Sequence, residues 1–255
     1  MKKEKRVLGI IPARYGSTRL EGKPLVDICG KPMIQRVYEK AKQANIDIVV
    51  ATDDKRIYDV VKFFGGNVVM TSKNHQTGTN RCLEAFNLIN DKCSSAYDVI
   101  INIQGDEPLL ESNQINELLT CFDDPKTEMA TLVMPVKDKT ELKSGVFVVK
   151  DINDYALYFS RAVIPFVRDV HKESWTDVST FYKHVGMYAF TPKALQEFAN
   201  LAETKLENAE KLEQLRWLEN GKKIKLANTK YNSVAVDTLE DVEKVKNIIS
   251  KTTKK

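Results

Sequence analysis

The most informative residues form one basic stretch near the N-terminus, Ile11–Leu25, which reads IPARYGSTRLEGKPL. It contains two arginines, one lysine, two aliphatic hydroxyls and two glycines, and it begins where an apolar run at 7–11 ends. Cationic side chains and exposed backbone N–H groups in such a loop can bind a polyphosphate. The stretch is not a Walker A loop, because Gly16 and Gly22 are six residues apart and a proline follows Lys23. It therefore favours an anionic ligand, and a basic surface loop is the alternative interpretation.

Two carboxylates stand at the ends of apolar segments elsewhere in the chain. Asp106 follows the apolar run 99–103 after a Gln-Gly pair, and Asp237 ends a second apolar segment. A carboxylate at the carboxyl end of a strand can approach a ligand closely and bind Mg²⁺. Each residue also has a purely structural interpretation, since Gly-Asp is common in turns and Thr238-x-x-Asp241 resembles a capping box. Spacing alone does not show whether the two carboxylates meet.

These residues must be positioned by the elements around them, and apolar runs alternate with helical periodicity through the first half of the chain. The alternation predicts an α/β fold with a mostly parallel sheet covered by helices on both faces. Ligands bind such sheets beyond the carboxyl ends of the strands, so we expect chemistry in the loops after Ile11, Ala51 and Ile103. The predicted elements are strands at 7–11, 46–51, 68–70 and 99–103 and helices at 32–44, 57–64 and 79–89.

The middle of the chain has a different pattern, with β-like segments and few helical signals between them. This predicts an antiparallel excursion from the main sheet, followed by helices and one more strand. Because no Pro-, Gly- or Ser-rich linker divides the chain, we predict a single domain over 1–255 with a β-rich insertion at 137–190. The predicted elements are strands at 129–136, 146–150, 156–161, 184–190 and 223–227, and helices at 192–201, at 206–219 and from Thr238 onward.

Composition excludes several classes of protein. The 255 residues include 39 Lys and Arg against 35 Asp and Glu, and a formal charge of +4 is too small to predict nucleic acid as a partner. No apolar run approaches the ~20 residues of a bilayer span, and the N-terminus does not resemble a signal peptide, so we expect a cytoplasmic protein without membrane insertion. The four cysteines lack C-x-x-C spacing, which argues against zinc, and two of them fall in helical apolar patterns that predict burial. They are Cys29, Cys82, Cys93 and Cys121, of which Cys82 and Cys121 are the pair predicted to be buried.

Taken together, the motifs resemble the 3-deoxy-D-manno-octulosonate (Kdo) cytidylyltransferase family, also called the CMP-Kdo synthetases. The family's opening signature, I-P-A-R-x-x-S-T-R-x-x-G-K-P-L, is matched at Ile11–Leu25, and the resemblance extends from Val7 to about Ile249. Further matches are Ala51-Thr-Asp-Asp, Gly65-Gly, His75-Gln-Thr-Gly-Thr with Arg81, Gln104-Gly-Asp-Glu-Pro, Tyr155-Ala-Leu-Tyr-Phe-Ser-Arg161, Lys183-His, Lys211-Leu-Glu-Gln-Leu-Arg216 and Val236-Asp-Thr.

The resemblance implies a fold and a reaction. The fold is a Rossmann-like nucleotidyltransferase of the nucleotide-diphospho-sugar transferase type, with a mixed, mostly parallel sheet, and the segment 137–190 forms a homodimer interface. The reaction transfers CMP from CTP to the anomeric hydroxyl of Kdo with Mg²⁺, releasing pyrophosphate, for lipopolysaccharide biosynthesis. Its transition state gains negative charge, which a metal ion and cationic side chains can stabilise without a covalent enzyme intermediate.

The resemblance also assigns roles residue by residue. Arg14 and Lys23 would hold the triphosphate and take part in catalysis together with Asp106 and Asp237, which would bind the metal. The residues implied to bind the nucleotide are Ala13, Arg14, Ser17, Arg19, Lys23, Arg81 and Gln104. Those implied to face the sugar are Gln104, Arg161, His184, Tyr188, Glu213 and Gln214.

Some of the residues implied to face the sugar also have purely structural interpretations. A lone histidine in an apolar strand is commonly structural, so His184 could simply be buried. Glu213 and Gln214 are adjacent on the predicted helix and would point about 100° apart, so a solvated helix face is the alternative for them. Trp217 on the same helix is predicted to be core.

The chain departs from the family pattern at a few positions. Asn80 stands where relatives often have an acidic residue, and Gly16 replaces a frequent alanine. The family commonly shows N-P-x-x-V-K-V-V before the Tyr155 motif, whereas this chain has Lys143-Ser-Gly-Val-Phe-Val-Val. Apolar Val146 or Phe147 therefore takes the place of a lysine at that edge of the expected sugar pocket.

Two alternatives remain open on sequence. The sugar could be 8-amino-Kdo or another 2-keto acid sugar, although the GSTR and KP sequences at 16–19 and 23–24 argue against the sialic acid branch. In a different class, the chain could be a catalytically inactive nucleotide-binding regulatory protein. The presence of Lys23, Asp106 and Asp237 favours the enzyme.

Overall fold

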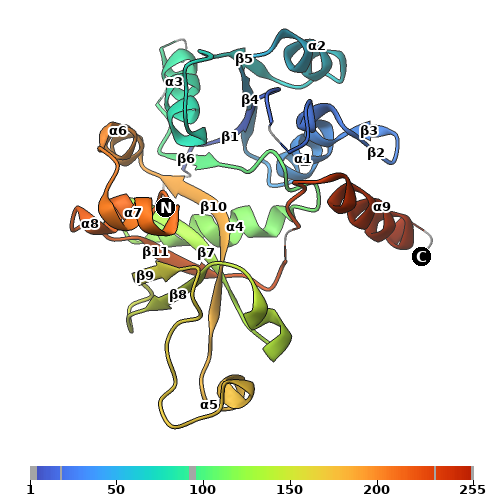
Figure 1. The fold of residues 1–255 in the computed structure, drawn as a ribbon. Helices are drawn as coiled ribbons and strands as arrows, with labels where there is room; N and C mark the ends of the chain where they lie inside the picture. Colours follow the sequence, from blue (N-terminus) through green and yellow to red (C-terminus); the bar gives the residue numbers. More distant parts are fainter. Residues whose placement is uncertain (1–4, 18, 92–95, 233, 254–255) are drawn as a thin grey trace. The chain divides into compact units, whose positions relative to one another are not determined.

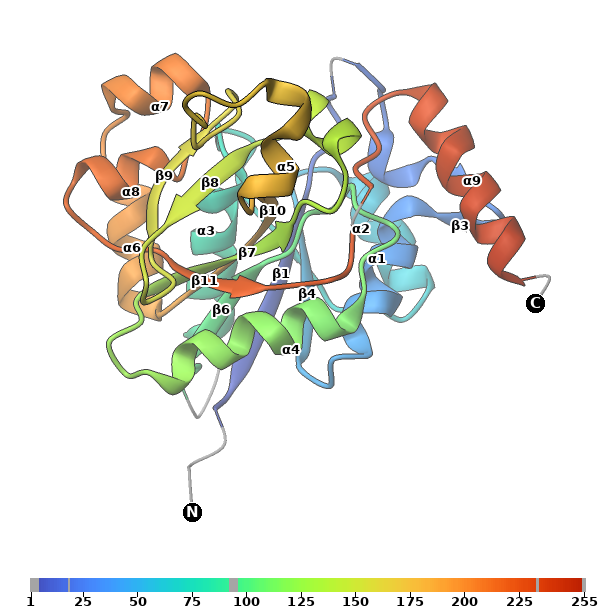
Figure 2. The ribbon, with the colours of Figure 1, turned by 90° about the horizontal axis from the view of Figure 1, so that it is seen from below.

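The computed structural model describes residues 5–17, 19–91, 96–232 and 234–253. Thr18 of the basic stretch and Cys93 lie outside the described residues. The chain forms two compact units, one comprising Met1–Ile115 with Ser233–Lys255 and the other Asn116–Asn232. Each unit has its own core, and both are drawn in Figures 1 and 2. Whether the chain counts as a single domain with an insertion at 137–190 stays a prediction.

The first unit is built on four parallel strands, as the alternation of patterns predicts. They are β1 (Val7–Ala13), β4 (Asp47–Thr52), β5 (Val68–Met70) and β6 (Val99–Asn102), and they lie in the order β6-β1-β4-β5. In register, Ile10 of β1 pairs with Val49 of β4 on one side and Asn102 of β6 on the other. The strands are almost wholly buried, because helices cover both faces of the parallel sheet. This burial explains why the strands read as continuous apolar runs in the sequence.

Three helices cover this sheet: α1 (Met33–Lys42), α2 (Lys55–Phe63) and α3 (Gly78–Asn90). Because crossovers between parallel strands are right-handed, the reversal of strand order after β5 brings α3 to the face opposite α1 and α2, as Figure 1 shows. The Asp54 carboxylate caps α2 and the Thr77 hydroxyl caps α3, while Gly65 at φ 78° follows α2. All the predicted elements of this half are present, with ends shifted by one or two residues.

Smaller elements complete the first unit. The basic stretch leads into a 3₁₀ turn, η1 (Lys23–Leu25), and a short hairpin of β2 (Asp27–Ile28) and β3 (Lys31–Pro32). The C-terminal helix α9 (Leu239–Thr253) packs its apolar face on Ile28 and Met33. Helix α4 (Ser112–Thr120) is not among the predicted elements.

The second unit contains the predicted β-rich region. Long strands β7 (Met129–Pro135) and β10 (Tyr182–Phe190) are antiparallel, and β11 (Lys225–Asn228) runs parallel to β7. Strands β8 (Phe147–Lys150) and β9 (Ala156–Ser160) form an antiparallel pair, with β8 beside the start of β10. The mixed, mostly parallel sheet expected from the sequence is therefore confirmed. The 3₁₀ turn η2 (Cys121–Asp123) precedes these strands, and between them lie η3 (Lys139–Lys143), η4 (Lys172–Ser174), α5 (Trp175–Val178) and α6 (Pro192–Asn200).

The single helix predicted at 206–219 is wrong. The structure has two short helices, α7 (Lys205–Glu210) and α8 (Leu215–Glu219), separated by a turn in which Lys211 is left-handed at φ 52°. The reason is a buried ion pair, Glu207 with Arg216 at 2.5 Å. These residues are nine apart and would lie about 13.5 Å apart along a continuous helix, so the pair forms only where the helix breaks.

Several predictions of burial are confirmed. Cys82 and Cys121 are buried, burial raises the pKa of the Cys121 thiol to about 11, and Trp217 is wholly inside the second unit. Cys29, in contrast, is exposed. Among the described residues, no helix has the length and apolar content needed to span a bilayer.

Candidate functional site

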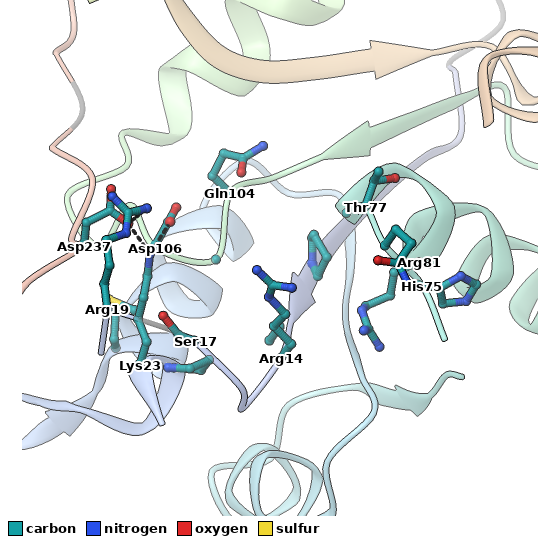
Figure 3. A pocket seen from close by; sticks show the side chains of 17 residues that line it. Arg14, Ser17, Arg19, Lys23, His75, Thr77, Arg81, Gln104, Asp106 and Asp237 are labelled. Carbon is teal, nitrogen blue, oxygen red and sulfur yellow. Dashed lines mark hydrogen bonds and ion pairs between the residues drawn. The ribbon is translucent and has the colours of Figure 1, made fainter. Parts of the chain in front are cut away.

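A pocket in the first unit opens at the carboxyl ends of β1 and β6, where ligands bind in open parallel sheets. Figure 3 shows Arg19, Lys23, Asp106 and Asp237 together at one end, His75, Thr77 and Arg81 at the other, and Arg14 between them. All nucleotide- and metal-binding residues implied by the sequence line it. The lining residues are Pro12, Ala13, Arg14, Ser17, Arg19, Lys23, Pro24, Met33, His75, Gln76, Thr77, Gly78, Arg81, Gln104, Gly105, Asp106 and Asp237.

Asp106 and Asp237, 131 residues apart in sequence, converge on one ammonium group. Lys23 Nζ lies 2.5 Å from Asp106 Oδ2 and 2.9 Å from Asp237 Oδ1, so these two oxygens are at most about 5.4 Å apart. Arg19 also reaches Asp237 Oδ1, at 2.9 Å. The spatial convergence that the sequence could not show is therefore present.

Backbone contacts explain how this convergence is held. The N–H of Val236 donates to the carbonyl of Asp106 at 2.9 Å, which joins the two segments next to the carboxylates. Gly105 passes so close to the β1 chain that a Cβ there would lie 2.8 Å from the carbonyl oxygen of Pro12. A glycine is therefore required where the chain turns toward Asp106.

The start of α9 fixes Asp237 from the other side. Thr238 and Asp241 form the predicted capping box, with Asp241 N donating to Thr238 Oγ1 and Thr238 N donating to Asp241 Oδ2. The same Asp241 oxygen accepts from Asp237 N at 3.2 Å. Hydrogen bonds from Thr238 and from the Asp237 backbone lower the pKa of Asp241 to about 2. The helix-start interpretation of this segment is therefore confirmed, and the same cap holds the backbone of Asp237 at the pocket, where its role in binding a metal stays a prediction.

At the other end of the pocket, the Arg81 side chain is buried and forms its hydrogen bonds with neighbouring residues of the protein. Its guanidinium donates to Asp53 Oδ2 at 2.8 Å, to Thr71 Oγ1 at 2.7 Å and to the carbonyl of Ser72 at 3.2 Å. The side chain thus binds β4 and the loop after β5 together, so one face of the pocket is rigid. Asp53 belongs to the Ala51-Thr-Asp-Asp motif, so the sequence already pointed to this partner of Arg81.

Glu84 is a residue that sequence reasoning missed. Its Oε2 accepts from Ser72 N at 2.9 Å and contacts His75 Nε2, so it anchors the loop 71–77 from helix α3. Burial raises the pKa of Glu84, but the hydrogen bonds from Ser72 and His75 outweigh burial and lower it overall. Its position three residues after Arg81, on a helix face turned to the pocket, could have suggested it.

Asn80, where relatives often carry an acid, takes part in the cap of α3. Its amide oxygen accepts from the Thr77 hydroxyl, and its backbone N–H donates to the same hydroxyl, each at 3.2 Å. The neutral side chain at position 80 therefore supports the helix start.

Gln104 lies in the pocket of the first unit, and the other five residues implied to face the sugar lie in the second unit. His184 and Tyr188 are neighbours on β10, with ring centroids 5.3 Å apart. Burial lowers the pKa of His184 to about 4, so the ring is neutral at pH 7. Burial and the nearby charge of Glu213 raise the pKa of Tyr188. His184, Tyr188 and Glu213 therefore form one group in the second unit.

Glu213 and Gln214 were predicted to lie on a continuous helix. The structure instead places them in the turn between α7 and α8. Both can therefore face one side without the 100° separation of helical neighbours. Gln214 is buried, and its Nε2 has no hydrogen-bond partner among the described residues. A buried amide without a partner costs free energy, so this donor is well placed for a ligand.

Arg161 lies beside the same turn. Its guanidinium donates to the carbonyls of Glu210 at 2.7 Å and Lys211 at 3.2 Å, at the end of α7. Its backbone N–H donates to the Glu210 carboxylate. The guanidinium is exposed and still has donors for an acidic ligand.

The departure at Val146 and Phe147 has a structural explanation. Phe147 is buried in a cluster with Leu142, Trp175 and Phe181. The carbonyl of Val146 accepts from His184 N at 2.8 Å, so this segment supports the histidine through its backbone. The apolar side chain at 147 belongs to the core.

The chain is similar to known cytidylyltransferases. The cytidylyltransferase family matches residues 8–224. A 3-deoxy-manno-octulosonate cytidylyltransferase of Parabacteroides distasonis is 50% identical over 94% of this chain and 96% of its own. An 8-amino-3,8-dideoxy-manno-octulosonate cytidylyltransferase of Shewanella baltica is 49% identical over 92% of this chain and 95% of its own.

Solved structures give the same result. A CMP:2-keto-3-deoxy-manno-octonic acid synthetase in complex with CTP matches with a TM-score of 0.87 and 40% identity, covering 97% of this chain and 99% of that one. A 4-diphosphocytidyl-2C-methyl-D-erythritol synthase of Anaerococcus prevotii, at 14% identity and a TM-score of 0.63, shares the fold alone. With half of its residues identical to a curated relative over nearly the whole length, and with the signature residues gathered in one pocket, this chain belongs to the 3-deoxy-manno-octulosonate cytidylyltransferase family.

Proposed function

We propose that this chain transfers CMP from CTP to the anomeric hydroxyl of Kdo, giving CMP-Kdo and pyrophosphate for lipopolysaccharide biosynthesis. The observation that carries the proposal is the convergence of Asp106 and Asp237 on one cationic group of the basic stretch, the ammonium of Lys23. Such a pair of carboxylates suits a nucleoside triphosphate carried with a divalent cation. Family membership supplies the substrate class.

Asp106 and Asp237 would hold Mg²⁺. Their donor set fits, because two carboxylates that already face a single ammonium group offer the hard oxygen ligands that Mg²⁺ prefers. Among the described residues, no group of three or more His, Cys, Asp or Glu side chains is arranged to hold a metal ion, so substrate phosphates and water would have to complete its coordination. When bound, the ion would stabilise charge on the α-phosphoryl oxygens and lower the pKa of the attacking hydroxyl.

The cationic residues would act on the triphosphate. Attack of the sugar hydroxyl on the α-phosphorus forms one P–O bond and breaks the bond to pyrophosphate. Lys23, Arg14 and Arg19 would neutralise the charge on that leaving group. Ala13, Ser17, Arg81 and Gln104 would shape the nucleotide side of the pocket, with Arg81 acting through the loop it anchors.

The sugar would be bound by Gln104, Arg161, His184, Tyr188, Glu213 and Gln214. Arg161 would meet the sugar carboxylate, because an exposed guanidinium fork matches it. The unpartnered amide donor of Gln214 and the polar atoms of His184 and Tyr188 would contact the hydroxyl groups of the sugar. A relative of almost equal identity uses 8-amino-Kdo by name, so that sugar is the second candidate substrate.

We further propose that the protein is a cytoplasmic homodimer whose interface includes residues 137–190. This segment exposes several large apolar side chains, which favours a protein partner. They are Ile152, Leu157, Phe166 and Val178.

The test is pyrophosphate release from CTP with Mg²⁺, measured with Kdo, with 8-amino-Kdo and with no sugar. Asp106→Asn should lower turnover by about a thousand-fold, because the metal ligand and its charge are lost. Its thermal unfolding should stay near that of the wild type, with Asp98→Asn as a control carboxylate outside the pocket. Near-normal turnover in Asp106→Asn would remove Asp106 from this role, and no sugar-dependent release by the wild type would favour the regulatory protein.

A further inference from the structure

Thr131 of β7 has one hydroxyl group surrounded by three polar atoms. Its Oγ1 lies 2.8 Å from the carbonyl oxygen of Met187, 3.3 Å from that of Val185 and 2.9 Å from His184 Nε2. The side chain is fully buried, so these atoms are its partners. The two carbonyls reach it because β10 bulges here, its register against β7 shifting between Val185 and Tyr188.

Counting hydrogens decides how these atoms interact. A hydroxyl carries one hydrogen and can accept with its lone pairs, whereas a carbonyl oxygen only accepts. If the Thr131 hydrogen pointed to His184, Oγ1 would face both carbonyl oxygens with no hydrogen between them. If it points to Met187, His184 Nε2 can donate to Oγ1, and only the more distant carbonyl of Val185, at 3.3 Å, faces Oγ1 without a hydrogen between them. The second arrangement is therefore favoured.

We infer that Thr131 is a positioning residue that fixes His184 in the tautomer protonated on Nε2, so that Nδ1 presents a hydrogen-bond acceptor to the sugar. The functional half of this inference rests on the proposed function, in which His184 contacts the sugar. The assignment of the tautomer rests on the hydrogen-bond geometry alone.

The surroundings of the ring agree with a fixed acceptor. Phe159 contacts it edge to face at 5.2 Å and 80°, and Tyr188 lies on another side at 5.3 Å, so the ring plane is held. His184 as a residue is half-buried and not fully enclosed. Burial keeps the His184 pKa near 4, so a second proton does not convert the acceptor into a donor at pH 7.

This assignment has a consequence for specificity. An acceptor nitrogen recognises an O–H or N–H group of the sugar and repels its carboxylate. His184 should therefore contact a hydroxyl or amino group, and the carboxylate should bind to a cationic group such as Arg161. A site that uses Nδ1 of His184 to accept a hydrogen bond from one hydroxyl or amino group of the sugar should reject sugar analogues that lack that group.

The test compares Thr131→Val, which removes the hydroxyl at equal size, with Thr131→Ser, which keeps it. Ring ¹⁵N NMR of the free protein reports the tautomer, and with three histidines in the chain a His184→Gln variant assigns the signals. We expect Nε2 protonated and Nδ1 bare at pH 7 in the wild type and in Thr131→Ser. In Thr131→Val we expect a mixture of tautomers and a KM for the sugar raised about ten-fold, with the KM for CTP unchanged.

A wild-type spectrum with the proton on Nδ1, or on both nitrogens, would overturn the assignment. A Thr131→Val protein with the wild-type tautomer and sugar KM would overturn the positioning role. Should Thr131→Val fail to fold, the spectra of the wild type and of Thr131→Ser still decide the tautomer. If the wild type releases no pyrophosphate with either sugar, the proposed function fails, while the spectra remain a separate test of the tautomer.

Discussion

Lys23 occupies the point at which the two site carboxylates meet, so it should compete with a metal ion in the absence of nucleotide. Replacing Lys23 by methionine keeps an unbranched side chain of similar length and removes the ammonium. We predict that Lys23→Met binds a divalent cation more tightly than the wild type when no CTP is present. The same variant should bind CTP more weakly, because a cation facing the triphosphate is lost.

The size of the effect follows from the two contacts of the ammonium. Hydrogen bonds between charged groups contribute about 1.5–3 kcal/mol each when buried, and exposed ion pairs contribute about 0–1 kcal/mol. The Lys23 side chain is 13% exposed, and Asp106 and Asp237 are 30% and 34% exposed, so the pairs lie between these limits. Because both carboxylates are about one-third exposed, we take about 0.7 kcal/mol for each of the two pairs, so displacing the ammonium should cost about 1.5 kcal/mol in total, which is about a ten-fold change in metal affinity.

The assay is Mn²⁺ binding followed by electron paramagnetic resonance, without nucleotide, on the wild type, Lys23→Met and a control. The matched control is Lys31→Met, because Lys31 pairs with Glu39 at 2.6 Å in the same unit but away from the pocket. We expect about ten-fold tighter binding in Lys23→Met and no change in Lys31→Met. Weaker or unchanged Mn²⁺ binding in Lys23→Met would refute the idea that the ammonium and the metal compete for the two carboxylates.

Three further predictions concern the supports of the site. Glu207→Gln should lower the free energy of unfolding in urea by about 3 kcal/mol, because it leaves Arg216 charged and buried, and a loss below 1 kcal/mol would contradict this. Hydrogen bonds lower the pKa of Asp241 to about 2 in the folded protein, against about 3.9 in the unfolded chain. The stabilisation is therefore complete above about pH 5, and it is lost as the pH falls through about 2. The difference in Tm between the wild type and Asp241→Asn should accordingly shrink steadily from about pH 5 down to about pH 2, and a difference that stays at its neutral-pH size over that range would count against the cap. Gly105→Ala should reduce turnover by about a hundred-fold with Mg²⁺ saturating, because a Cβ 2.8 Å from the Pro12 carbonyl must displace the loop of the site, and unchanged turnover would show that the loop tolerates it.

The first unit could be predicted from sequence because its signals are local. A run such as Val7–Ile11 is buried on both faces and ends at a proline, and Gly65 stops a helix at a fixed position. Helix α4 was missed, since the residues 112–120 begin without a sequence signal as clear as the prolines and glycines elsewhere. Local patterns therefore determine most elements but not all of them.

The pocket could be predicted only in part. The signature Ile11–Leu25 predicted the cationic residues of the pocket, and the turn after β6 predicted Asp106. These predictions were possible because each segment directly follows a buried strand. The partners that hold them, such as Glu84 with Ser72 and Val236 with Asp106, are set by tertiary contacts that leave no spacing rule in the sequence. The family resemblance therefore predicted the pocket residues, and the structure shows the hydrogen bonds that hold them in place.

The second unit shows why a helical pattern can be misleading near a site. Residues 206–219 carry apolar side chains at helical spacing, yet a continuous helix would separate Glu207 from Arg216 and leave two charges without partners in the core. Breaking the helix at Lys211 costs a left-handed residue, about 1 kcal/mol, and gains a buried charge pair worth several times as much in avoided desolvation. The break also turns Gln214 inward with an unpartnered amide. A local rule is thus violated beside a buried amide donor that has no partner among the described residues, and this makes Gln214 the residue to mutate.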